Sequence, residues 1–137
     1  MPRVPVPPEA SAFLALPNPA VIATMRPDGS PHSVPTWYDW DDGRVLVNMD
    51  ETRLRLAFLR RDPRASLTVL DHDSWYRHVS LIGRVVSIEH DPELVDIDRL
   101  ARHYTGMPFR NREARRVSAR FVPERWHGWS DSGPWPR

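Results

Sequence analysis

Two arginines, Arg53 and Arg55, are the residues whose type and spacing best suit binding chemistry. They follow the strand-like run 45–49, and Asp50 or Thr52 can cap the helix predicted to come next, which places both arginines in its first turn. Cations there oppose the helix macrodipole, whereas the free N–H groups attract anions. A bound phosphate or carboxylate would make the arrangement favourable, because guanidinium groups donate two hydrogen bonds at once. The pattern predicts an anion-binding corner, with a solvated basic helix as an equal alternative.

The composition removes several other kinds of chemistry. The chain has 137 residues, enough for one domain with a real core, and a net charge of only +1. That charge and the lack of a recognition motif argue against a nucleic-acid partner. All 19 basic residues are arginines, a bias that a GC-rich genome explains as well as ligand binding does. Without cysteine there is no thiol nucleophile, and the six histidines lack metal-ligand spacing, so no metal site is expected.

The ends of the chain predict location and boundaries. Residues 1–8 are rich in proline and lack the apolar core of a signal peptide, and no run approaches the roughly 18 apolar residues of a membrane helix. We therefore expect a cytoplasmic protein without a membrane partner. The expected organisation is an extended arm over 1–8, a domain over 9–129 and a tail over 130–137.

Turn signals and alternation predict a mainly β protein with short helices. Strands are expected over 20–26, 31–40, 44–49, 65–70, 75–90 and 116–122, and helices over 9–16, from about 53 to 61, and over 91–104. Six strands joined largely by tight turns favour a small antiparallel barrel, with Gly83 as a bend. Aromatic residues on both faces of 31–40 predict that this strand lines a cleft or is covered by another subunit, and Pro35 within it predicts an edge or a bulge.

A resemblance to a known family rests on the order and spacing of six motifs. They are Phe13-Leu-Ala-Leu-Pro17, Ala23-Thr-Met-Arg-Pro-Asp-Gly-Ser-Pro31, Val34-Pro-Thr-Trp-Tyr38, Arg53-x-Arg55, Leu59-Arg-Arg-Asp-Pro-Arg-Ala-Ser66 and Tyr104-Thr-Gly106. Over roughly 9–129 the chain resembles the pyridoxamine-5′-phosphate-oxidase-like split-barrel superfamily. Within it, the chain is similar to the F420 (deazaflavin)-dependent oxidoreductases of actinobacteria, the branch called FDOR-B. The resemblance implies a six-stranded Greek-key split barrel of the FMN-binding type, a homodimer, and cofactor sites along the dimer interface.

The resemblance also implies a function and a set of site residues. The function is transfer of a hydride between reduced F420 and an unidentified small organic acceptor. Arg53 and Arg55 would hold the cofactor phosphate, with Thr52 supplying a hydroxyl. The residues expected around the ring are Asn48, Met49, Pro35, Thr36 and Trp37, with Trp75, Tyr76 and Arg77 contributed by one or the other subunit. The last three have an equal alternative as a barrel rim that closes the core.

Catalytic side chains are not assigned, because a redox cofactor carries the reactive carbon and needs no protein nucleophile. Ala57 and Phe58 depart from the family, in which Arg and Asn are frequent there, so contacts to the cofactor tail are less well supported. The group Arg110, Arg112, Arg115 and Arg116 could bind an acidic cofactor tail or form a solvated face. Two alternative functions remain open: an FMN-binding oxidase or reductase of the same fold, and a dimer that binds or sequesters F420 without turnover.

Overall fold

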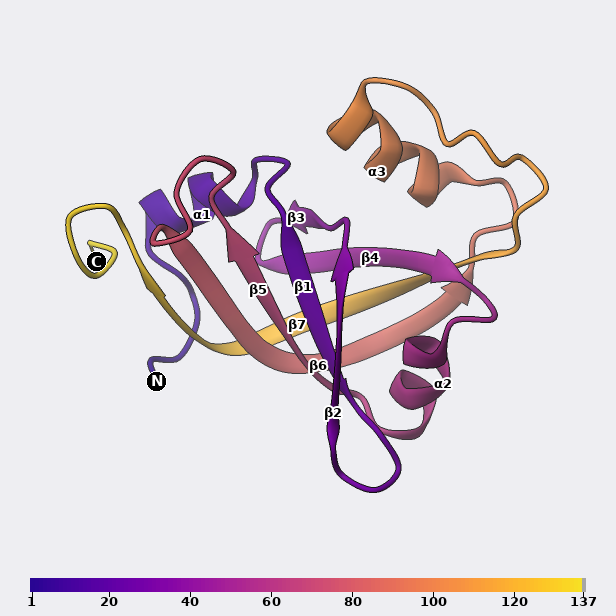
Figure 1. Ribbon diagram of the computed structural model, residues 1–137, viewed down its shortest axis with the longest axis horizontal. Helices are drawn as coiled ribbons and strands as arrows, with labels where there is room; N and C mark the ends of the chain where they lie inside the picture. The colour runs from indigo at the N-terminus through magenta and orange to yellow at the C-terminus, as the bar shows by residue number, and fades with distance from the viewer. Residues whose placement is uncertain (137) are drawn as a thin grey trace.

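The computed structural model describes residues 1–136 and is mainly β (Figure 1). Its elements are α1 (Pro8–Leu14), β1 (Ala20–Met25), β2 (Pro31–Thr36), β3 (Asp39–Asp41), β4 (Arg44–Asp50), α2 (Leu54–Arg61), β5 (Arg64–Leu70), β6 (His78–His90), α3 (Val95–Thr105) and β7 (Arg116–Trp129). All strand pairings are antiparallel, as expected. No helix within the described residues is long and apolar enough to cross a membrane.

The sheet curls because its two edge strands are neighbours in the chain. The strand order is β2-β1-β5-β6-β7-β4-β3, so β2 and β3 lie at opposite edges. Only Trp37 and Tyr38 separate them in sequence, a connection that spans at most about 11 Å. The edges must therefore approach each other, and the sheet forms a barrel that is open along this seam.

The single strand expected over 31–40 was wrong, because the chain breaks at the seam. Tyr38 turns inward until only 1% of it is exposed, and its hydroxyl donates to the carbonyl oxygen of Leu14 at 2.7 Å. The run therefore divides into β2 and β3, which gives seven strands rather than the six expected. Pro35 lies on β2, which pairs only with β1, so the edge position predicted for this proline is confirmed.

The two longest strands differ from expectation at their ends. The segment 71–77 is a turn, in which Asp71 N–H donates to the Arg77 carbonyl at 2.8 Å, so β6 starts at His78 and not at Trp75. Strand β7 continues past Pro123 to Trp129. The missing N–H of Pro123 is tolerated because this residue lies at a register shift of the β6–β7 ladder.

Gly83 is the bend that the sequence predicts. The same register shift falls between Ile82 and Gly83, and a Cβ placed on Gly83 would overlap the carbonyl oxygen of Val122. Only glycine allows the two backbones to approach this closely.

Both ends of the described chain pack on the barrel. In the segment expected as an arm, the backbone N–H of Val4 donates to the backbone carbonyl of Glu124 at 3.1 Å, and the backbone carbonyl of Pro2 accepts from the backbone N–H of Trp126 at 3.0 Å. In the segment expected as a tail, the Trp135 indole is buried and donates to the His78 carbonyl at 2.9 Å. Position 137 of that tail lies outside the described residues.

Helix α3 has a small apolar core of its own beside β4. Leu46, Leu94, Ile97 and Leu100 form this second cluster, with Trp37 and Phe109 packed against it. Figure 1 shows α3 and the segment after it, in orange, on one side of the sheet. The helix starts four residues after Asp91, whose carboxylate accepts the N–H groups of Asp96 (3.2 Å) and Ile97 (2.9 Å).

Candidate anion-binding and aromatic site

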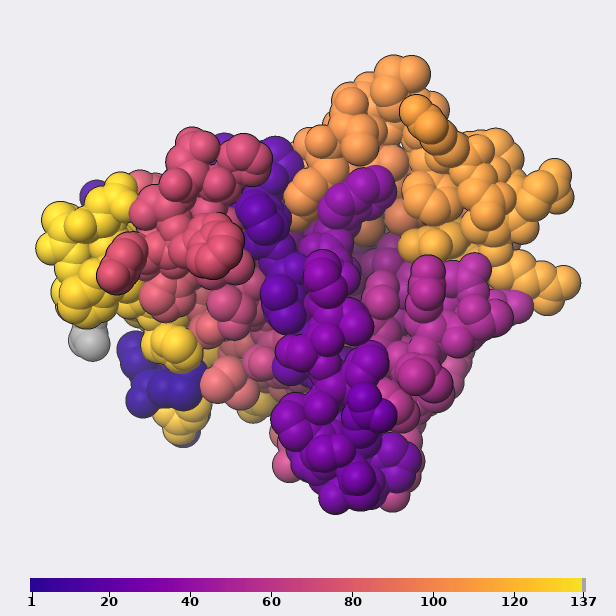
Figure 2. All heavy atoms as spheres, in the orientation of Figure 1, coloured from indigo at the N-terminus to yellow at the C-terminus, as the bar shows by residue number. Residues whose placement is uncertain are grey.

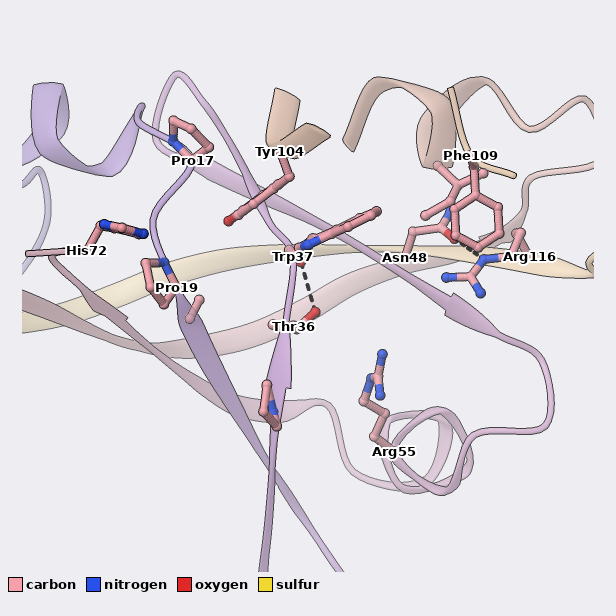
Figure 3. A pocket seen from close by; sticks show the side chains of 13 residues that line it. Pro17, Pro19, Thr36, Trp37, Asn48, Arg55, His72, Tyr104, Phe109 and Arg116 are labelled. Carbon is pink, nitrogen blue, oxygen red and sulfur yellow. Dashed lines mark hydrogen bonds between the residues drawn. The ribbon is translucent and has the colours of Figure 1, made fainter. Parts of the chain in front are cut away.

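A cavity of about 550 Å³ opens at the seam of the barrel (Figure 3). Its walls come from the α1–β1 connection, the β2–β3 connection, β4, α2, the 71–77 turn, the α3 region and the start of β7. The site therefore depends on the curled sheet, which brings these distant segments together. It has a basic end and an aromatic wall.

Arg55 and Arg116 form the basic end. In Figure 3 they extend from α2 and from the start of β7 into the same space. Burial lowers the pKa of Arg55, and the charges of Arg53 and Arg116 lower it further. Burial also lowers the pKa of Arg116; Arg53 adds to this effect, while the nearby Asp50 and Asp91 carboxylates oppose it. The Arg55 Nε is buried without a hydrogen-bond partner, and within residues 1–136 neither arginine forms an ion pair. An anion would supply the missing acceptors.

Asn48 holds Arg116 in place. Its Oδ1 accepts from Arg116 Nε at 2.9 Å, while its Nδ2 donates to Ser118 Oγ at 2.9 Å and to Asp91 Oδ2 at 3.2 Å. Asn48 is only 5% exposed, and the Arg116 guanidinium also lies over the Phe109 ring, 4.8 Å from its centroid. Asn48 and Phe109 thus hold the Arg116 side chain in one orientation, so its charge is positioned before any ligand binds.

Trp37 and Tyr104 form the aromatic wall. Their rings are stacked, with centroids 5.4 Å apart and planes 11° from parallel. The Tyr104 hydroxyl donates to the Asn18 carbonyl at 2.7 Å, and burial raises the pKa of this phenol well above its usual value. Tyr104 therefore offers a flat surface and no readily transferred proton.

Five of the residues predicted for the cofactor site line this cavity. They are Pro35, Thr36, Trp37, Asn48 and Arg55. The first three come from the strand predicted to line a cleft or to be covered by a subunit. The structure thus brings one predicted arginine and four of the eight predicted ring contacts to one place.

Arg53 and Thr52 lie outside the cavity, on the exposed turn before α2. The Asp50 carboxylate accepts both the Thr52 hydroxyl (2.6 Å) and the Thr52 N–H (2.9 Å). The expected cap by Asp50 or Thr52 was wrong, because the helix starts at Leu54, Arg53 occupies the N-cap position and no side chain caps the helix. The Thr52 hydroxyl donates its proton to Asp50 within the turn.

Met49 points away from the cavity. It is 1% exposed in the main core, because successive side chains of β4 lie on opposite faces of the sheet and Asn48 faces the cavity. Trp75 and Tyr76 are 79% and 80% exposed on the 71–77 turn and do not line the cavity of this protomer.

Arg77 packs at the opposite end of the barrel from the basic site. Its guanidinium lies 4.9 Å from the Trp135 ring centroid and 5.3 Å from that of Phe13, with Asp71 at 3.6 Å. Within the protomer these contacts fit the alternative that this segment closes the core.

Eight cavity residues were not among the predicted cofactor contacts: Pro17, Pro19, Ala20, His72, Ile97, Tyr104, Phe109 and Arg116. Arg116 was predicted only as one of four arginines, with Arg110, Arg112 and Arg115, that could bind an acidic tail. The structure places these four arginines in different surroundings. Arg112 pairs with Asp98 at 2.6 Å and Arg115 with Glu51 at 3.7 Å, while Arg110 is exposed. The signal that could have selected Arg116 is strand pairing, since Asp50 and Arg116 are opposite each other in the β4–β7 register.

Solved structures share this fold along almost the whole chain. An F420 reductase is 27% identical with a TM-score of 0.81, over 88% of this chain and 98% of that one. A conserved hypothetical protein from Mycobacterium tuberculosis is 28% identical with a TM-score of 0.69, over 90% and 84%. A putative pyridoxamine 5′-phosphate oxidase from Listeria innocua, at 18% identity and a TM-score of 0.67 over 86% and 93%, shares the fold.

The family follows from the sequence match. The model of the pyridoxamine 5′-phosphate oxidase family matches residues 6–130, so the chain belongs to that family. The resemblance to the split-barrel superfamily, with its F420-dependent branch, is confirmed.

Proposed function

We propose that this protein is an oxidoreductase that binds F420 and transfers a hydride between the reduced cofactor and a small organic acceptor. The observation that carries the proposal is the placement of two half-buried guanidinium groups, Arg55 with an unpartnered Nε and Arg116, in the same cavity as the stacked Trp37 and Tyr104 rings. Such a cavity suits a flat molecule with an anionic stem. The similarity to an F420 reductase over 88% of the chain supports the choice of cofactor.

The donor set of the cavity fits a phosphorylated cofactor. A phosphate offers several acceptor oxygens, and the Arg55 Nε is a buried donor without an acceptor. Arg116 is oriented by Asn48, so the two guanidinium groups would hold the anion while Trp37 lies against a flat ring. When bound, the cofactor supplies the hydride-carrying carbon, and the protein contributes binding, orientation and exclusion of water.

The proposal includes a homodimer in which a second subunit completes each cofactor site. It is supported by the exposure of Trp75 and Tyr76, since exposed aromatic surface of this kind marks interaction sites. Their expected contribution to a cofactor ring would then come across the interface. We also propose a cytoplasmic location, where reduced cofactors are available.

Titration with two cofactors tests the proposal. We expect F420 to bind more tightly than FMN, and reduced F420 to be oxidised when a suitable acceptor from a broad panel is added. Tighter binding of FMN would instead assign the FMN-dependent function that the family match also supports. Tight F420 binding without oxidation by any acceptor would assign a sequestering role.

A further inference from the structure

A second cavity, of about 780 Å³, lies beside the first one. Trp37 and Phe109 line both cavities, so they separate the second space from the cavity that holds Arg55 and Arg116. The remaining walls come from α3 and the segment 107–112. Figure 2 shows this part of the chain, in orange, as the upper part of the surface beside the purple segment of β2 and β3.

A buried carboxylate fixes the wall of this second cavity. Asp98, 8% exposed, accepts from the Phe109 N–H at 2.9 Å and from Arg112 Nη1 at 2.6 Å, and the same nitrogen donates to the Phe109 carbonyl at 3.1 Å. The segment after α3 is therefore held against the helix by a closed set of polar contacts. The cavity is a built feature of the fold.

The lining of the second cavity is largely apolar, with two neutral polar residues, Thr105 and Asn111, and two arginines. The apolar surface comes from Trp37, Ala101, Met107, Pro108 and Phe109. Asp98 neutralises the charge of Arg112.

Arg110, by contrast, makes no ion pair or side-chain hydrogen bond with the rest of residues 1–136. Met107 is 66% exposed, which is a large exposed fraction for an apolar side chain beside a cavity. A ligand that covered Met107 would remove this apolar surface from water.

We propose that the second cavity binds a small apolar carboxylate, with its hydrocarbon part against Met107 and Phe109 and its carboxylate on Arg110. The volume lies within the range of small-molecule sites, and a guanidinium is the side chain that best matches a carboxylate. Because Trp37 and Phe109 are shared, the bound molecule lies next to the first cavity. The proposed binding does not depend on the proposed function.

Calorimetry with a matched pair of probes tests the site. The probes are naphthalene-2-carboxylate and the neutral 2-naphthylmethanol, with the full-length protein. We expect the carboxylate to bind about tenfold more tightly than the alcohol, the preference that one charge-assisted hydrogen bond gives. Arg110→Gln should remove the preference, and Met107→Asp should weaken both probes. Arg102→Gln, on the exposed side of α3 and lining neither cavity, should change nothing.

Two results would overturn the assignment. One is equal carboxylate affinity in the wild-type protein and Arg110→Gln. The other is the absence of binding at millimolar probe together with a stable dimer in sedimentation, which would make the cavity a contact between copies of the chain.

Failure of the proposed function is recognised separately. Arg55→Ala should weaken F420 and leave naphthalene-2-carboxylate unaffected, whereas Arg110→Gln should do the reverse. A protein that binds the carboxylate but not F420 refutes the proposed function alone. A protein that binds F420 but shows no Arg110-dependent carboxylate binding refutes the second site alone.

Discussion

Replacing Arg55 by alanine should weaken cofactor binding far more than replacing Arg53. Arg55 is half-buried in the cavity with an unpartnered Nε, whereas Arg53 is exposed outside it. A hydrogen bond to a charged group contributes about 1.5–3 kcal/mol, and the half-exposed position favours the lower part, about 1.5–2 kcal/mol. The dissociation constant for F420 should therefore rise roughly 10- to 30-fold in Arg55→Ala and less than about threefold in Arg53→Ala.

The same substitution should not destabilise the unliganded protein. The pKa of Arg55 is lowered by burial and by neighbouring arginines, so the folded state disfavours its charged form relative to the unfolded chain. At pH 7, far below either pKa, the charge is present and opposes folding, and its removal relieves that cost. We expect a melting temperature for Arg55→Ala equal to or above that of the wild type.

Thermal unfolding with and without F420 measures both effects in one experiment. At 100 times the dissociation constant, a ligand stabilises the folded state by about 2.7 kcal/mol, on the order of 10 °C for a domain of this size. The shift should shrink in Arg55→Ala and Arg116→Ala and persist in Arg60→Ala, an exposed arginine of α2 outside the cavity. A full ligand shift in both cavity variants would refute the assignment of this basic end.

Three further substitutions test the framework around the site. Asn48→Ala leaves buried polar partners unsatisfied and should lower the free energy of unfolding in urea by about 2–3 kcal/mol, besides weakening F420 binding. Gly83→Ala places a Cβ on the Val122 carbonyl and should cost about 3 kcal/mol in the same assay, or prevent folding. The pKa of Asp98 is lowered, chiefly by the hydrogen bond from Arg112, so this carboxylate stabilises the fold above its unfolded pKa of 3.8. Asp98→Asn should be less stable at pH 7, and the difference should vanish as the pH falls below that value.

The positions of most strands could be predicted from the sequence. The strand over 78–90 and the bend at Gly83 were predicted correctly, because one buried face and one close backbone approach impose a local pattern. The break at Tyr38 was not predicted. It depends on the carbonyl groups of Leu14, at the end of α1, and of Leu16, just after it, which accept the tyrosine hydroxyl from more than 20 residues away. Local alternation contains no signal for such a contact.

The site was predictable where its residues lie on one strand or one turn. Trp37 and Arg55 come from segments with unusual local composition, and the structure places both in the cavity. Arg116 and Phe109 enter only through the pairing of β4 with β7 and the position of the segment after α3. A prediction from spacing therefore named Arg53, the sequence neighbour of Arg55, whereas the arginine that shares its cavity is Arg116.

The position of Arg116 connects the basic end to the rest of the fold. Asn48 binds Arg116 and Asp91 at once, and Asp91 holds the first N–H groups of α3. The helix that supplies Tyr104 and the arginine at the basic end of the cavity thus share one buried polar network. Burial disfavours the charge of both Arg55 and Arg116, and the charge of Arg116 adds to the cost at Arg55. The network keeps Arg116 in this position although it raises that cost, and this is the physical reason to propose that the cavity binds an anion.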